Sequence, residues 1–146
     1  MNYLSVWKMI SHSRAKAHCA VALLFVLCVS CNTNSSNGDS IARAFEEHQS
    51  NVQVEGEGTV LRILPDDAIG SPHQKFIVQI PSGPTVLIEH NIDLAPRIDE
   101  LKVGDAISFS GEYVWNEKGG LIHWTHHDPT GKHQAGWIKY AGRTYQ

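Results

Sequence analysis

From residue 50 onward, hydrophobic and polar positions alternate in short runs, and a period of two is typical of strands that bury one face. Five such runs follow one another along the chain: 56–64, 73–80, 85–92, 105–115 and 121–127. The closing residues, 136–146, add two shorter runs around Ala141 and Gly142, which predicts a last hairpin turning at that pair. The pattern therefore predicts a mainly β domain of short strands.

Two other stretches follow a helical pattern. Residues 40–49 predict a short N-terminal helix with Ser40 as its N-cap, and residues 93–102 predict a second helix, with Asp93 as its cap and Pro96 in its first turn. Three strands, a short helix and two more strands is the order of an OB-fold, a five-stranded partly open barrel. A β-sandwich or a different small barrel is the alternative that the pattern leaves open.

The second and third predicted strands can be aligned by matching their hydrophobic positions. A connecting loop of three or five residues stacks apolar positions on apolar positions and pairs Phe76 with His90. The same register sets His73 opposite Asp93 on the other face. These two side chains are therefore expected to form a cross-strand pair at the open end of the hairpin.

The fourth and fifth predicted strands can be treated in the same way. A four-residue turn makes Tyr113 face Trp124, so that both strands direct aromatic residues toward the core. The opposite face then has His123 beside Glu112, while His126 falls on the core side of its strand. The last predicted strand is therefore expected to divide its polar residues between two faces.

Residues 1–31 have the layout of a bacterial export signal, with basic residues, the apolar run CAVALLFVLCVS and then small residues. The end of this run, CVSC, resembles a lipobox, which implies that Cys31 is the lipidated first residue of a periplasmic lipoprotein. Asn32, and not Asp, follows Cys31, and by resemblance to Gram-negative sorting this favours anchoring in the outer membrane. Cys28 stands where a lipobox usually has Leu, so secretion without a lipid is the alternative. Residues 32–51 are then expected to be a polar linker with a short helix, and residues 52–146 the barrel domain.

Several segments are similar to a known family: HQKFIVQI, IEHNIDLAPRI, GEYVWNEKGGLIHWTHHDPTGKH, and the closing GWI and YQ. They resemble a family of small exported bacterial proteins known only as a domain of unknown function, family 3465, over about residues 52–146. LKVGDAISFSGEY is also similar to the strand that follows the helix in OB-folds. The resemblance implies one exported domain and brings no activity with it, so the function has to be argued from the residues.

The balance of charge limits the partners of the exported part. Three of the twelve basic residues, Lys8, Arg14 and Lys16, lie in the predicted signal, which leaves nine basic against fifteen acidic residues. A sequence-independent nucleic-acid binder normally has a basic surface. The composition therefore disfavours non-specific nucleic-acid binding and leaves a small molecule, a glycan or a protein as the partner. A lipid on Cys31 would add the membrane.

Four histidines lie within HWTHHDPTGKH, residues 123–133, and suggest a metal site. On a straight strand, residues four apart are separated by about 13 Å, so His123 and His127 cannot share one ion. The turn at the end of this stretch could instead bring two imidazoles and a carboxylate together, a set that suits Zn²⁺ or another divalent metal. The candidate metal or ligand residues are His127, Asp128, His133, His73 and His90. A hydrogen-bonded polar rim without a metal is the alternative.

The main hypothesis is an exported cell-envelope OB-fold binding domain of unknown specificity, with a metal at its His-rich end as a further expectation. One alternative is a metal-assisted hydrolase, phosphodiesterase or nuclease-like, in which a metal-bound water is the nucleophile. The other is a structural or assembly lipoprotein without a small ligand. The secondary site candidates are Asn91, Asp93, Arg97, His123 and Glu112. Arg97 lies in a stretch similar to the IDAPE of staphylococcal-nuclease-like OB domains, but the neighbouring catalytic pattern is missing, and the sequence does not decide whether the protein is an enzyme.

Overall fold

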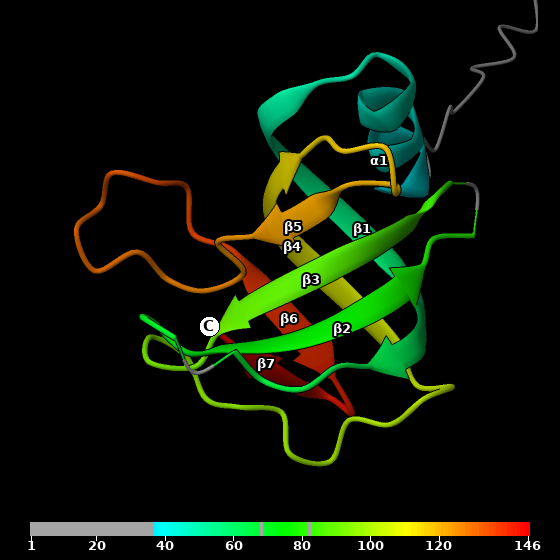
Figure 1. The fold of residues 1–146 in the computed structure, drawn as a ribbon. Helices are drawn as coiled ribbons and strands as arrows, with labels where there is room; N and C mark the ends of the chain where they lie inside the picture. The colour runs from blue at the N-terminus through cyan, green and yellow to red at the C-terminus, as the bar shows by residue number, and fades with distance from the viewer. Residues whose placement is uncertain (1–36, 68, 82) are drawn as a thin grey trace, which may run out of the picture. The chain divides into compact units, whose positions relative to one another are not determined.

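Seven strands and one helix form in the part of the chain that the structure describes (Figure 1). This computed structural model describes residues 37–146 except 68 and 82, so the predicted export signal and Cys31 lie outside the described residues. In chain order the elements are α1 (Asn37–Glu46), β1 (Ser50–Ile63), β2 (His73–Gln79), β3 (Thr85–Asn91), β4 (Ala106–Val114), β5 (Leu121–His123), β6 (Trp137–Tyr140) and β7 (Arg143–Tyr145).

Five of the strands close into a barrel. They follow the order β1-β2-β3-β5-β4, and an additional pairing between β1 and β4 completes the ring. Neighbouring strands are antiparallel except β3 and β5, which are parallel. The strands β6 and β7 extend the sheet from β4 as the predicted closing hairpin, and its turn residues Ala141 and Gly142 both have positive φ, 48° and 77°. The predicted mainly β, OB-like barrel is confirmed.

The long strand β1 pairs with two strands, β2 and β4, and this double pairing closes the ring. Its residues 50–59 pair with β4, and its residues 59–63 pair with β2, with a register shift between Val60 and Arg62. A Cβ atom on Gly58, near the crossing point, would lie 2.3 Å from the carbonyl oxygen of Gln79. Only glycine therefore allows β1 and β2 to approach each other as closely as they do at this point.

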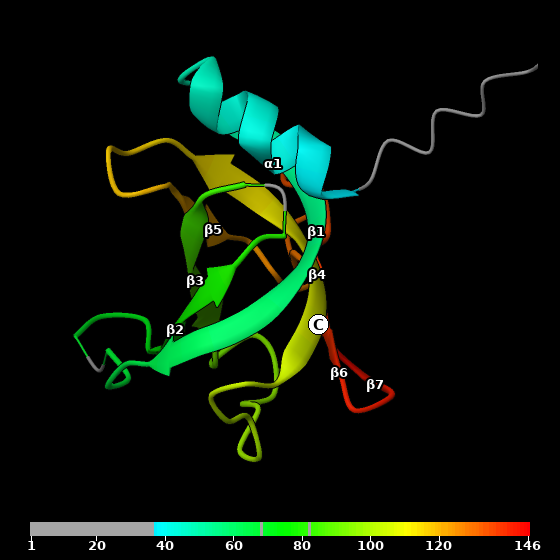
Figure 2. The same cartoon turned by 90° about the vertical axis from the view of Figure 1, so that its right-hand side faces the viewer.

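The hydrophobic core lies inside the barrel and is covered at both ends. Inward positions alternate along each strand, and the side chains of Phe76, Ile88 and Phe109 are fully buried. Figures 1 and 2 show α1 across one end of the barrel and the segment between β3 and β4 at the other, where Ile98 is also fully buried. Each fully buried side chain of this size contributes about 1.5–3 kcal/mol of hydrophobic stabilisation. Among the described residues, no helix combines the length and the apolar character needed to cross a membrane.

The helix α1 lies where a short N-terminal helix was predicted, but its bounds differ. It begins at Asn37, so Ser40 lies inside the helix and is not its N-cap. The Ser40 hydroxyl instead donates to the carbonyl oxygen of Glu55 in β1, at 3.4 Å. Ile41 and Ala44 are buried against the barrel, so α1 contributes to the core.

The helix predicted for residues 93–102 is wrong, because this segment forms turns instead. The side-chain oxygen of Asn91, rather than that of Asp93, accepts the first two backbone N–H groups of the segment, at 2.9 and 3.3 Å. The N–H of Ile98 donates to Oε1 of Gln74 in β2, at 2.9 Å, and not to a helical carbonyl. Side chains from the barrel thus take the backbone donors that a helix would need.

The predicted register between β2 and β3 is wrong by two residues. His73 lies opposite Asn91 rather than Asp93, and Phe76 lies opposite Ile88. The connecting turn begins one residue earlier than expected, because β2 ends at residue 79. A shift of two residues leaves the same side chains on each face, so the buried face was predicted correctly although the pairs were not.

The predicted register between β4 and β5 is also two residues out. Tyr113 faces Ile122 rather than Trp124, because the connecting loop has six residues instead of four. His123 does lie beside Glu112, as predicted. The strand β5 ends at His123, since Trp124 has a φ of 51° and the chain leaves the sheet there.

Candidate functional site

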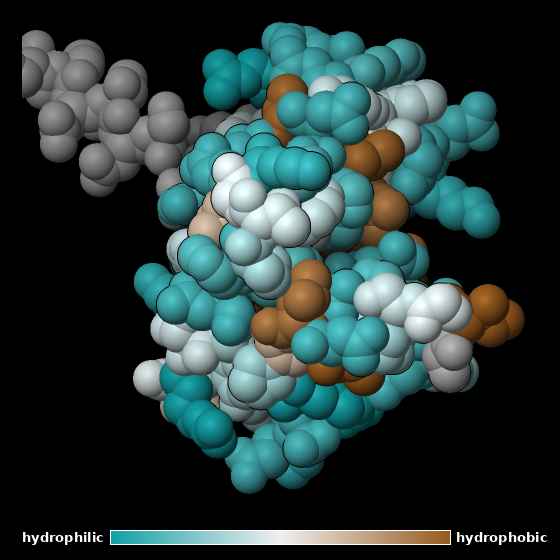
Figure 3. All heavy atoms as spheres, turned by 90° about the vertical axis from the view of Figure 1, so that its left-hand side faces the viewer, coloured by the Kyte–Doolittle hydropathy of each residue, from teal (hydrophilic) through white to brown (hydrophobic). Residues whose placement is uncertain are grey.

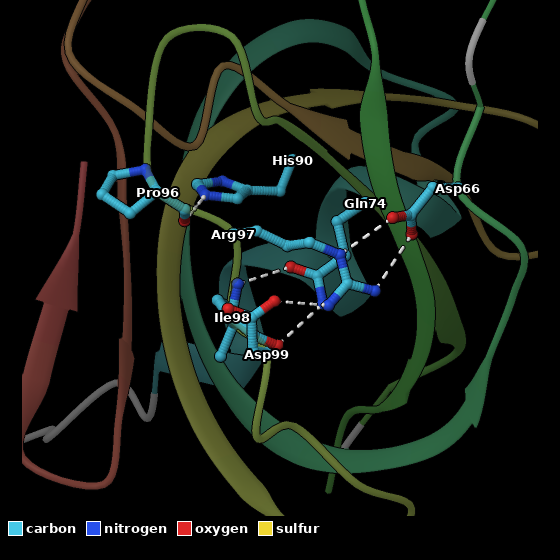
Figure 4. Close-up of polar contacts among 7 residues, drawn as sticks. All are labelled: Asp66, Gln74, His90, Pro96, Arg97, Ile98 and Asp99. Carbon is cyan, nitrogen blue, oxygen red and sulfur yellow. Dashed lines mark hydrogen bonds and ion pairs between the residues drawn. The ribbon is translucent and has the colours of Figure 1, made fainter.

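Buried polar side chains hold the segment after β3 over one end of the barrel, and Gln74 does so through two hydrogen bonds to the backbone of Ile98 (Figure 4). Its Oε1 accepts the N–H of Ile98 at 2.9 Å, and its Nε2 donates to the carbonyl oxygen of Ile98 at 3.0 Å. Gln74 is 1% exposed. One amide side chain thus satisfies both backbone groups of a buried residue, and this end of the barrel is closed by polar contacts.

His90 makes the second buried contact at this end of the barrel. Its Nε2 lies 3.3 Å from the carbonyl oxygen of Pro96, and its Nδ1 lies 2.8 Å from the Thr125 hydroxyl. A carbonyl oxygen can only accept, so Nε2 carries the proton and Nδ1 accepts from Thr125. Burial lowers the pKa of His90 from 6.5 to about 4, so the imidazole is neutral near pH 7. Both ring nitrogens are already engaged, which removes His90 from the candidate ligands.

Arg97 links two loops outside the barrel. Its Nε donates to Asp66 and its Nη1 to Asp99, each at 2.9 Å. Hydrogen bonding, to Asp66 first and to Asp99 second, raises the pKa of the Arg97 guanidinium. The side chain is more than a third exposed, so these pairs add little to stability. Arg97 joins the β1–β2 loop to the segment after β3 and does not face the site described below.

The loop of residues 124–136, which projects to the left in Figure 1, is organised around the carboxylate of Asp128. The oxygens accept the backbone N–H groups of Thr130, Lys132 and His133, at 2.8, 2.7 and 2.8 Å. Hydrogen bonding, first from Thr130 and then from His133, holds the pKa of Asp128 well below its usual range. The Asp128 carboxylate is therefore an internal cap of the loop rather than a group open to an ion.

A cluster of ring side chains surrounds Glu112 on the outer face of the barrel. Nε2 of His123 lies 3.3 Å from one carboxylate oxygen, and Nδ1 of His133 lies 3.7 Å from the other. His133 also stacks on Trp124, with ring centroids 3.8 Å apart and planes 13° apart. The ring of His126 lies 5.3 Å from that of Trp124. The indole is thus held in place by its imidazole neighbours.

Trp124 forms one wall of a pocket of about 240 Å³ on the outer face of β2, β3 and β5, called the Trp124 pocket below. Its lining consists of His73, Glu89, Asn91, Leu94, His123, Trp124 and His126. Figure 3 shows the molecule from the side on which the 124–136 loop projects, and this side is mostly hydrophilic with small hydrophobic areas. This part of the barrel therefore carries a polar pocket with one aromatic wall.

Strand pairing explains how these residues meet. The β2–β3 register sets His73 opposite Asn91, and the parallel pairing of β3 with β5 brings Glu89 to the level of His123. Asn91 is occupied by the turn that follows it and by Ser71. Within the described residues, neither the Glu89 nor the His73 side chain makes a hydrogen bond. These two groups are therefore available to a ligand.

The structure separates the residues that were expected to gather around a metal. His127 is exposed, Asp128 faces the backbone of its own loop, and His133 turns toward Trp124. His90 is inside the barrel, while His73 lines the Trp124 pocket. In the part of the chain that the structure describes, no group of three or more His, Cys, Asp or Glu side chains is placed to hold a metal ion. The convergence of residues 127, 128 and 133 on one point is not observed.

The secondary candidates divide in two. Glu112 and His123 lie together as expected, and Asn91 lines the Trp124 pocket. Asp93 is exposed beyond the end of β3, and Arg97 pairs with carboxylates elsewhere. The histidine-rich strand end is therefore a functional candidate through its pocket rather than through a ready set of metal ligands.

Several residues of this region were not predicted as site residues: Glu89, Leu94, Trp124, His126, Gln74 and Thr125. Thr125 packs beside Gly111, where a Cβ atom would lie 2.9 Å from the Thr125 methyl. His126 is buried and lines the Trp124 pocket. One signal was available for Gln74, because it shares the inward face of β2 with Phe76. A polar residue in a row of core residues indicates a buried hydrogen bond.

Comparison with known proteins adds a family but no activity. The sequence model of a family described as "Protein of unknown function (DUF3465)" matches residues 23–146. No curated protein matches the chain. The match includes every residue that lines the Trp124 pocket. Because the family has no known function, the function of this chain has to be inferred from the geometry of the site.

Proposed function

We propose, for a chain that belongs to the DUF3465 family of proteins of unknown function, that the barrel is a binding domain whose Trp124 pocket holds a hydroxyl-bearing ligand, such as one ring of a glycan. The proposal rests on one observation, the combination of an indole, three imidazoles and a carboxylate around one hollow. The predicted export signal supports a place in the cell envelope. Metal binding and hydrolysis stay predictions, and no observed geometry favours them.

The polar groups of the pocket match the hydrogen-bonding needs of hydroxyl groups. A hydroxyl both donates and accepts, a carboxylate accepts, and a neutral imidazole does one at each nitrogen. Glu89 can accept from the ligand, and His73 can donate or accept. His123 keeps its Nδ1 for the ligand, because its Nε2 faces Glu112. Neighbouring hydroxyls on a sugar ring could therefore be satisfied from two strands at once.

The indole supplies the apolar part of the site. His133 stacks on one face of Trp124, so the orientation of the ring is fixed before a ligand arrives. The C–H face of a sugar ring can pack against such an aromatic surface, while the polar edge of the indole stays in contact with water. OB-folds also bind oligosaccharides on the face of their second and third strands, and β2 and β3 contribute to this pocket.

Size and charge favour a small uncharged ligand. The volume of about 240 Å³ lies below the range of about 300–1,000 Å³ typical of pockets for drug-sized ligands. No lysine or arginine lines the pocket. Lys75 lies opposite Glu89 across the β2–β3 pair, and its ammonium makes an ion pair with Asp67, at 3.6 Å. Glu89 would repel a phosphate, in a protein whose net charge is already −3.

The test is a nuclear magnetic resonance titration of the protein with three uncharged saccharides: maltotriose, mannobiose and N,N′-diacetylchitobiose. We expect at least one of them to shift the backbone amides of β3 and β5 around Glu89 and His123. Glu89→Gln should weaken that saccharide about tenfold or more, because a hydrogen bond to a charged group contributes about 1.5–3 kcal/mol. Glu55→Gln, which removes an exposed carboxylate from β1, is the matched control and should leave the affinity unchanged.

Two outcomes would contradict the proposal. In the first, none of the three saccharides shifts the amides around the pocket, even at high concentration. In the second, Glu89→Gln and Glu55→Gln weaken binding equally. Added salt provides a further check, because a neutral ligand should bind equally well at low and high salt. A steep loss of affinity with salt would indicate phosphate recognition instead.

A further inference from the structure

A second hollow lies on the outer face of β1, β4 and β6, and it shares no lining residue with the Trp124 pocket. Its volume is about 480 Å³. The β6–β7 hairpin forms one wall through Tyr140 and the turn at residues 141–142, and Pro81 lies at the opposite side. The hairpin lies outside the closed ring of five strands, so the hollow forms where this extension of the sheet meets the barrel.

Short side chains on β4 make the floor of this hollow. Strand pairing sets Ser108 between Glu57 of β1 and Lys139 of β6 in one cross-strand row. In the next row, Ala106 lies opposite Thr59. Serine and alanine on the middle strand do not fill the space between the longer side chains of the outer strands, and a trough results.

The two walls of the trough carry opposite charges that do not neutralise each other. Within the described residues, the Glu57 carboxylate has no ion pair and no hydrogen bond. The Lys139 ammonium lies over the ring of Trp137, 4.2 Å from its centroid, which holds the charge in place without cancelling it. The backbones of β1 and β6 are two strand spacings apart, about 9.6 Å.

We infer that this trough is a binding site for a small zwitterion, with a ligand amine against Glu57 and a ligand carboxylate against Lys139. Short unmodified peptides belong to this class, and two or three extended residues span about 7–10 Å, close to the separation of the two walls. A ligand with a single charge would be attracted by one wall and repelled by the other. The charge pattern therefore selects for both termini at once.

The test measures binding of L-alanyl-L-alanine by calorimetry at low salt, beside two blocked analogues. The N-acetyl dipeptide lacks the amine, and the dipeptide amide lacks the carboxylate. We expect each analogue to bind up to about fivefold more weakly than the zwitterion, as the loss of one exposed charge pair worth up to about 1 kcal/mol implies.

Two variants assign each end of the ligand to its wall. Glu57→Gln should weaken L-alanyl-L-alanine by up to about fivefold and remove the discrimination against the N-acetyl analogue, while Lys139→Gln should do the same for the amide. Both residues are exposed, so the variants are expected to fold, which their melting temperatures would show. Glu55→Gln, which changes the next outward residue of β1, is the matched control and should bind like the wild type.

Failure of L-alanyl-L-alanine to bind at millimolar concentration would overturn the inference. Equal affinity for the zwitterion and for both blocked analogues would overturn it as well, because the trough would then recognise the peptide backbone and not the termini. Neither result bears on the Trp124 pocket, which shares no residue with this site.

Discussion

Acidification should destabilise the protein through His90, whose imidazole is buried between the Pro96 carbonyl and the Thr125 hydroxyl. The pKa of this residue is about 4 in the folded protein, against an ordinary value of 6.5. The fold prefers the neutral ring, so the contribution of His90 is fully present above pH 6.5 and is lost as the pH falls from 6.5 toward 4.

The size of this effect follows from the two pKa values of His90. At pH 5 the unfolded chain binds nearly one proton at this ring and the folded protein about a tenth of one, which lowers the free energy of unfolding by about 2 kcal/mol. Well below pH 4, the decrease in the free energy of unfolding that is due to His90 reaches its maximum of about 3 kcal/mol. A small domain has about 5–15 kcal/mol of stability in total, so the loss should be easy to measure.

The assay is urea unfolding at several pH values between 8 and 5, on the wild type and on His90→Gln. Glutamine keeps a donor and an acceptor at this position but does not titrate. The difference in unfolding free energy between the two proteins should change by about 2 kcal/mol in favour of the variant as the pH falls. Taking the difference cancels the titration of the other histidines.

Parallel pH profiles for the wild type and His90→Gln would refute this reasoning. If the variant does not fold, the titration of the His90 ring protons in the wild type, followed by nuclear magnetic resonance, decides the matter. A pKa near 6.5 for that ring would show that burial does not disfavour its charged form.

Three further substitutions test the contacts around the site. Gln74→Met should lower the unfolding free energy by about 1–3 kcal/mol, because it leaves the buried N–H of Ile98 unpaired and leaves the Ile98 carbonyl oxygen with only the N–H of Leu101, at 3.4 Å. Gln79→Met removes two hydrogen bonds that are only partly buried and should cost less than about 1 kcal/mol; equal losses in urea unfolding would contradict this. Asp128→Asn should speed hydrogen exchange at the His133 amide, since that N–H donates to the carboxylate at 2.8 Å, and unchanged exchange would mean that the cap does not order the loop. Gly111→Ala should cost about 1–3 kcal/mol, visible as a lower melting temperature, because the new methyl would press against backbone. An unchanged melting temperature would show that the strand can move aside.

The strands could be predicted from the sequence because burial on one face imposes the period of two on each of them. Even with both registers two residues out, the buried faces of β2, β3 and β4 were predicted correctly, since an even shift preserves them. The core position predicted for Trp124 was wrong, because the chain leaves the sheet at that residue and its indole lies on the outer face. The helix at 93–102 could not be excluded in this way. Its loss depends on Gln74 and Asn91, side chains that lie outside the segment and reach its backbone only in the folded barrel.

The site was less predictable than the fold, for a physical reason. The Trp124 pocket depends on the parallel pairing of β3 with β5, which no local pattern in the sequence encodes. The turn at 127–133 was expected to bring metal ligands together around an ion. The Asp128 carboxylate instead accepts hydrogen bonds from backbone N–H groups of its own loop. His90 is the last of the buried residues that alternate along β3, a position that fits its buried hydrogen bonds.

The most direct test of the proposed function is a search for nuclear Overhauser effects between the ring protons of a bound saccharide and the tryptophan side chains. The chain has four tryptophans, so the assignment can discriminate between surfaces. We expect cross-peaks from the sugar to the indole of Trp124 and to the ring of His123, and none to Trp137. Cross-peaks to Trp137 alone, or to no tryptophan while the saccharide is bound, would contradict a binding site in the Trp124 pocket.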